Sequence, residues 1–137
     1  MIQRPRRING LASKKVHSER NGQEVVSDCR MATGFFSRLC GWMMVPPVSA
    51  GEGLLLSPCN DIHMGFMRFA IDAVFLRSLD PDRSDLSRFE VTSVRPGLQP
   101  WRLLPVRDGQ ADSTLELPAG AAQSAGIIVG DVLICSG

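Results

Sequence analysis

The apolar residues of this chain come in many short runs, and this limits the possible folds more than any other feature. The runs have the length of β-strands and are separated by turn-forming pairs such as Asn21-Gly22 and Asp108-Gly109. Asn-Gly between two apolar runs is typical of a two-residue hairpin, because both positions require positive φ. Short runs at regular spacing favour a compact barrel or sandwich over a doubly wound α/β fold.

We therefore expect a mainly β domain with two short helices. Leu39, Trp42 and Met43 recur at three to four residues and indicate the first helix. The stretch AGAAQSAG after Pro118 indicates the second, which Gly126 ends. Strands are expected at residues 16–19, 23–26, 53–57, 71–77, 89–94, 101–106, 114–117 and 132–135.

The length of 137 residues fits one domain. We expect residues 1–15 to form a basic, flexible N-terminal arm and residues 16–137 to form a single mostly-β domain. A functional arm would contact phosphate or anionic lipid. The alternative is a solvated tail without a specific role, which we favour because termini are usually loose. The net charge of +1 argues against a nucleic-acid footprint spread over the whole domain.

The N-terminal region lacks the apolar segment of a signal peptide. No apolar run approaches the roughly 18 residues that a membrane span needs. These observations predict a cytoplasmic protein, in which Cys29, Cys40, Cys59 and Cys135 are reduced thiols. The cysteines form no C-x-x-C pair, so neither a zinc ribbon nor a thioredoxin-like motif is indicated.

Four segments taken together resemble one family: GEGLLLSPCNDIH, FMRFAIDAVFL, PGLQPWR and LELPAGAAQSAGIIVGD. The chain is similar over residues 32–132 to the domain-of-unknown-function 192 family of small bacterial and archaeal domains. It departs from the family pattern at Ala70, where proline is frequent, and at Met64, where threonine is common. The resemblance implies a mostly β, barrel-like fold with one or two short helices. It implies no activity, because the family has no established one.

Asp72 interrupts the apolar run IDAVFL. In a strand its side chain shares one face with Val74 and Leu76, while Ala73 and Phe75 share the other. Both faces are apolar, which predicts burial on both sides and makes a carboxylate costly unless it is paired or hydrogen-bonded. We favour a structural role in which backbone N–H groups bind it. The alternative is a carboxylate that lines a pocket.

Nearby side chains suggest three classes of function. A non-catalytic binding or accessory module would use a polar pocket of His63, Met67, Arg68, Asp72 and Trp101. A hydrolase would use His63 and Asp72 as acid and base. A metal-binding protein would use Cys59 and His63, although the sequence places no further ligands.

We favour the binding module, for an unknown small molecule or protein, with no cofactor and with no membrane span or nucleic acid. Glu116 in LELPAG resembles Asp72 as an acid among apolar residues, which raises the prospect of a polar site that the two share. Whether the chain is an enzyme, and its oligomeric state, stay open at this stage.

Overall fold

Nine β-strands and one short helix make up the described part of the computed structural model, which covers residues 13–34, 42, 47–65, 67–80 and 86–137. The elements in chain order are β1 (Ser13–Ser18), β2 (Glu24–Ala32), β3 (Glu52–Leu56), β4 (Asp61–Ile62), β5 (Ile71–Ser78), β6 (Arg88–Leu98), β7 (Val106–Arg107), β8 (Ser113–Pro118), α3 (Ala121–Ser124) and β9 (Val132–Ser136).

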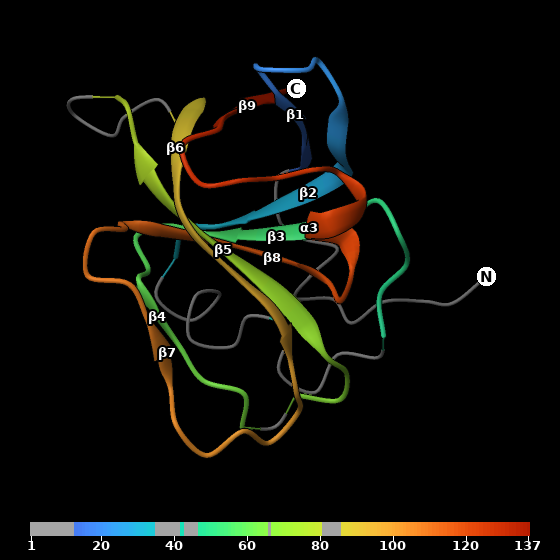
Figure 1. Cartoon of the computed structure of the whole chain (residues 1–137), viewed down its shortest axis with the longest axis vertical. Helices are drawn as coiled ribbons and strands as arrows, with labels where there is room; N and C mark the ends of the chain where they lie inside the picture. Colours follow the sequence, from blue (N-terminus) through green and yellow to red (C-terminus); the bar gives the residue numbers. More distant parts are fainter. Residues whose placement is uncertain (1–12, 35–41, 43–46, 66, 81–85) are drawn as a thin grey trace.

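Seven of the strands close into a barrel in the order β1-β2-β3-β8-β5-β6-β9, and β9 returns to β1. The neighbours are antiparallel except β2 and β3, which run parallel. The short strands β4 and β7 form a separate two-stranded sheet, which Figure 1 shows below the barrel. The prediction of a mainly β, barrel-like domain is confirmed.

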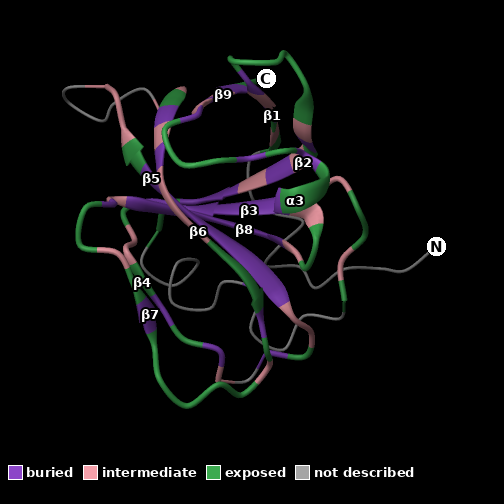
Figure 2. Ribbon diagram, in the orientation of Figure 1, coloured by how far each residue is buried: buried purple, intermediate pink, exposed green. Residues whose placement is uncertain are grey.

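The barrel wall separates two apolar clusters. Every barrel strand contributes to the first, which fills the interior and includes Val16, Val74, Leu115 and Leu133. The second cluster lies outside the wall, where the β4–β7 sheet and the loops near it cover β3, β5 and β8. These three strands are therefore buried on both faces, as their continuous apolar runs predict, and they are mostly purple in Figure 2.

Local signals in the sequence explain most of the turns. Gly22 adopts a φ of 69° between β1 and β2, at the predicted Asn-Gly hairpin. The predicted C-terminal helix is α3, and Gly126 follows it with a φ of 68°. One helix is therefore described, where two were expected. The other expected helix, around Leu39, lies mostly outside the described residues.

The barrel starts earlier than the expected domain boundary, because β1 begins at Ser13. Arg20 belongs to the fold as well. Its Nε donates to Asp131 Oδ1 at 2.7 Å, and its guanidinium also donates to the Gly126 carbonyl at 2.9 Å. The pKa of Asp131 is lowered chiefly by this hydrogen bond from Arg20. The pair fastens the β1–β2 hairpin to the segment that leads into β9.

The expected strand at residues 101–106 is wrong, apart from its last residue. Only Val106 of that range is in a strand, and Trp101 sits in a turn with a φ of 63°. Pro100 and Pro105 bracket the segment and have no N–H to donate to a sheet. The connection between β6 and β7 is consequently an exposed loop, green along much of the lower edge of Figure 2.

Candidate functional site

Asp72 is 1% exposed, and backbone N–H groups bind both of its carboxylate oxygens. Oδ1 accepts from Gly97 N at 2.9 Å, and Oδ2 accepts from Gly120 N and Ala122 N at 3.0 Å each. Gly97 and Gly120 both have positive φ, a backbone conformation that glycine adopts more readily than other residues. The carboxylate therefore binds two backbone segments of this unusual conformation. Of the two roles considered for Asp72, these contacts favour the structural one, which fastens β6 and α3 to β5.

Glu116 lies on the opposite face of the same wall. In the register between β5 and β8, Asp72 stands opposite Leu117 and Ala73 stands opposite Glu116. Directly opposed residues share a face, so Asp72 faces the interior cluster and Glu116 faces the outer one. The two acids therefore do not form the shared polar site that their similar sequence contexts suggested.

The Glu116 carboxyl group is enclosed by the outer apolar cluster and is 5% exposed. Burial raises its pKa from 4.5 to about 8, so the group is protonated at neutral pH. Among the described residues, its Oε2 atom has no hydrogen-bond partner. A neutral carboxylic acid of this kind can donate a hydrogen bond, as some catalytic acids do, but solvent hardly reaches this one.

Cys59 lies close enough to Glu116 for the two groups to interact electrostatically. Burial chiefly raises the pKa of its thiol, and the carboxyl groups of Glu116 and Asp61 raise it further. The thiol contacts the Asp61 carbonyl at 3.4 Å. A protonated thiol is a poor nucleophile and a poor metal ligand, so the surroundings of Cys59 do not favour either role.

His63 is exposed, whereas Asp72 is buried with both oxygens bound by N–H groups. An acid–base pair in a hydrolase must converge on one cleft. The positions of His63 and Asp72 do not support that arrangement. Nowhere in the described ranges do three His, Cys, Asp or Glu side chains gather in a way that would hold a metal ion.

The segment that holds Met64 and Met67 meets the loop at Trp101 at one carbonyl group. The Met64 oxygen accepts from Met67 N at 3.2 Å and from Trp101 N at 2.8 Å. Met64 and Met67 are buried in the outer cluster, while His63 and Arg68 remain exposed. The structure therefore brings the segment that carries His63 and Arg68 against Trp101, while Met67 is buried in the outer cluster and Asp72 faces the barrel interior.

Residues 101–104, which we call the tip, expose an unusual amount of apolar surface. Trp101 is 58% exposed, Leu104 69% and Leu103 96%. A bulky residue at a φ of 63° is also a backbone outlier, and such strain is often found at functional sites. From the sequence, both leucines were expected in a strand at residues 101–106. The two flanking prolines and the lack of alternation were the signals that could have identified a loop.

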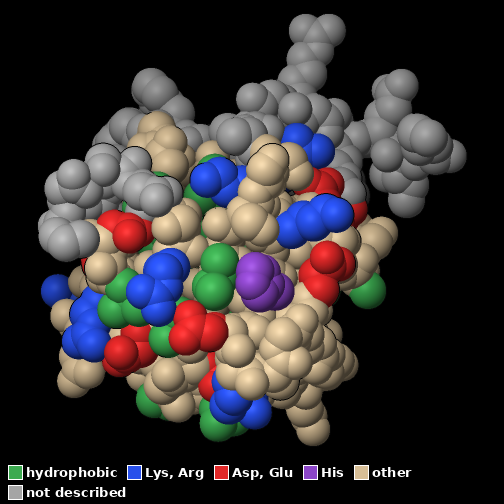
Figure 3. Space-filling model, turned by 90° about the horizontal axis from the view of Figure 1, so that it is seen from above, with side chains coloured by type: hydrophobic (Ala, Val, Ile, Leu, Met, Phe, Trp, Pro, Cys, Tyr) green, Lys and Arg blue, Asp and Glu red, His purple; other side chains and the backbone are tan. Residues whose placement is uncertain are grey.

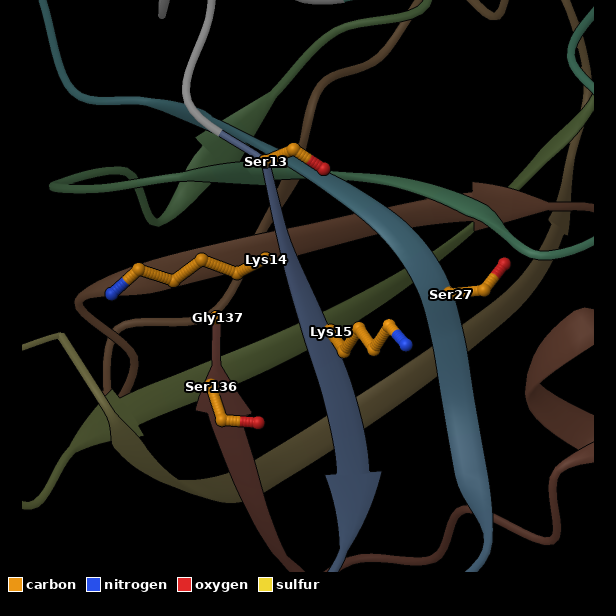
Figure 4. A pocket seen from close by; sticks show the side chains of 6 residues that line it. All are labelled: Ser13, Lys14, Lys15, Ser27, Ser136 and Gly137. Carbon is orange, nitrogen blue, oxygen red and sulfur yellow. The ribbon is translucent and has the colours of Figure 1, made fainter.

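An open hollow of about 450 Å³ lies at another place, beside β1, β2 and β9. Ser13, Lys14, Lys15, Ser27, Ser136 and Gly137 line it. Lysine ammonium and serine hydroxyl groups suit an anion. In Figure 4, however, the Lys14 and Lys15 side chains leave β1 in opposite directions, so the two charges do not converge on one ligand.

The end of the molecule opposite the β4–β7 sheet carries both signs of charge. Figure 3, seen from above, shows acidic and basic side chains interspersed around a histidine. An ion pair also joins two neighbouring barrel strands, Arg77 with Glu90 at 2.9 Å. No helix in the described ranges is both long and apolar enough to cross a membrane.

Two solved structures have the same fold. One is a proposed transcription regulator of Sinorhizobium meliloti 1021, with 18% identity and a TM-score of 0.77, covering 91% of this chain and 95% of that one. The other is a protein of unknown function from Novosphingobium aromaticivorans DSM 12444, with 19% identity and a TM-score of 0.69, covering 90% and 84%. At such identities the likeness concerns the fold alone.

A search of curated proteins gave no match. The profile of the DUF192 family, described as "Uncharacterized ACR", matches residues 16–135. The match spans all nine described strands except the first residues of β1 and the last residue of β9. The chain therefore belongs to the domain-of-unknown-function 192 family.

Proposed function

We propose that this protein is a non-catalytic binding module and that its recognition face consists of the tip, residues 101–104, together with His63 and Arg68. The single observation that carries the proposal is the exposure of Trp101, Leu103 and Leu104 on one loop. Apolar side chains that are exposed together often mark an interaction surface. Met67 N and Trp101 N donate to the same Met64 carbonyl, and Asp72 fastens β6 and α3 to β5.

The role of the tip in the fold is small by this proposal. Leu103 makes few contacts with its own chain, since it is 96% exposed. The double variant Leu103→Ser/Leu104→Ser is therefore expected to keep a free energy of unfolding within about 0.5 kcal/mol of the wild type, as surface changes usually do. A loss above about 2 kcal/mol in urea denaturation would show that the loop is structural.

Binding is tested by site-specific photocrosslinking in cells that express the full chain. A benzophenone amino acid at position 103 is expected to give discrete adducts, whether to protein or to lipid. The matched control is position 129, where Val129 is 64% exposed on the segment between α3 and β9. Indistinguishable adducts from the two positions would overturn the proposal.

We also propose that the protein is cytoplasmic. Cys29, Cys59 and Cys135 are free thiols, as expected in a reducing compartment. Fractionation of cells that produce the untagged chain tests the location; recovery with secreted or periplasmic material would contradict it.

A further inference from the structure

The chemistry of the recognition face limits the kinds of partner that it can bind. This inference rests on the proposed function. We propose that the tip docks on the surface of an anionic lipid bilayer. Trp101, Leu103 and Leu104 would enter the boundary between headgroups and acyl chains, and the arginines around them would contact the phosphates.

The apolar part of the tip suits a lipid surface better than a protein pocket. Protein interfaces depend on anchor side chains that are held in position and fit a complementary pocket. Leu103 is 96% exposed, so its own chain does little to hold the side chain in one orientation. The headgroup boundary of a bilayer needs no such fit, and indole rings are favoured there because they combine an apolar body with one polar group.

The arginines of the described chain differ in whether an acid pairs with them. Four arginines of the barrel each pair with a carboxylate: Arg20, Arg30, Arg77 and Arg88. Within the described ranges, four further arginines form no ion pair: Arg68, Arg102, Arg107 of β7 and Arg95 of β6.

Two acids moderate this positive charge. Asp61 stands opposite Arg107 in the β4–β7 sheet, and Asp108 interacts electrostatically with Arg95. Asp108 also accepts from the Thr92 and Ser93 hydroxyls at 2.7 Å each. Arg68 and Arg102 form no ion pair with an acid of the described chain, and their charge complements phosphate headgroups. Each basic residue near the surface of an anionic bilayer raises the affinity for that bilayer by about fivefold.

The test is co-sedimentation of the full chain with sucrose-loaded vesicles of phosphatidylcholine containing 30 mol% phosphatidylglycerol, beside vesicles of phosphatidylcholine alone. We expect binding to the anionic vesicles, at least fivefold weaker binding to the neutral ones, and further weakening as salt is raised. Lipids brominated near the headgroup should quench the tryptophan emission, because Trp101 enters the bilayer while Trp42 is buried in the outer cluster.

Variants separate the tip from other basic parts of the chain. Leu103→Ser/Leu104→Ser should lower the affinity about tenfold, and Arg102→Gln about fivefold. The matched control is Ile128→Ser/Val129→Ser, which removes the other exposed apolar pair of the described surface and should leave binding unchanged.

Two results would overturn the lipid proposal: no sedimentation with anionic vesicles at millimolar lipid, or sedimentation that the tip variant and its control reduce equally. Protein-only adducts from position 103 in cells, without vesicle binding, would leave the binding module intact with a protein partner. Failure of both experiments would remove both proposals.

Discussion

Replacing Glu116 by glutamine should change how the stability of this protein depends on pH. The substitution keeps the size and shape of the side chain and removes the only group in it that titrates. Glu116 lies in the outer apolar cluster, and within the described chain no donor or acceptor reaches its Oε2 atom. The fold therefore holds the neutral acid and disfavours the carboxylate.

The sign and size of the effect follow from the pKa. Burial raises the pKa of Glu116 from 4.5, its value in the unfolded chain, to about 8. Between these values the folded protein binds more protons than the unfolded chain, so its free energy of unfolding falls as pH rises. The contribution is fully present below pH 4.5 and is lost by about pH 8, at about 1.4 kcal/mol per pH unit. Over the whole interval, the loss in the free energy of unfolding is roughly 4–5 kcal/mol.

Urea denaturation from pH 5 to pH 8.5 measures this dependence. The Glu116→Gln variant carries a buried amide at every pH, with no described partner at the Oε2 position, so only the shape of its curve against pH is informative. The difference from wild type should favour the wild type at pH 5 and shrink or reverse by pH 8. Exposed Glu24→Gln serves as control and should follow the wild-type curve in parallel. Parallel curves for wild type and Glu116→Gln would refute the reasoning.

Two further predictions concern the barrel itself. Asp72→Asn should lower the free energy of unfolding by about 2–4 kcal/mol, because an amide nitrogen would face an N–H donor, either Gly97 or the pair at α3; a loss below about 0.5 kcal/mol in urea would contradict the structural role. Gly51→Ala should cost about 1 kcal/mol more than Gly22→Ala, since both positions have positive φ but only at Gly51 does a Cβ meet Ser27 Oγ, at 2.7 Å. Equal losses would show that Ser27 rotates away freely.

Much of the fold could be predicted from local patterns. The hairpin at Asn21-Gly22, the helix after Pro118 and the strand that starts at Ile71 each have a signal within a few neighbouring residues. The acid in that last strand was also recognised as a group that needs backbone donors. The two-residue strand β4 was missed, because a segment so short carries no periodicity.

The candidate site could be predicted only in part. The Met64 carbonyl joins the backbone of Met67 and Trp101, so the segments that carry His63, Arg68 and Trp101 meet there, while the binding role of these residues stays a prediction. Leu103 and Leu104 were placed in an expected strand at residues 101–106, because a short apolar run is typical of one. Their exposure depends on the position of the loop between β6 and β7 relative to the barrel, and no local sequence pattern specifies that position.

Sequence alone determined that the chain forms a mainly β domain and that Asp72 would be buried, since alternation and turn residues act over a few positions. Tertiary structure alone decided which face each acid occupies. Glu116 and Asp72 have similar neighbours in sequence, but the register of β5 against β8 turns one to the outer cluster and the other to the barrel interior. Register joins residues far apart in the chain, so it determines that Asp72 meets three N–H groups while Glu116 remains protonated among apolar side chains.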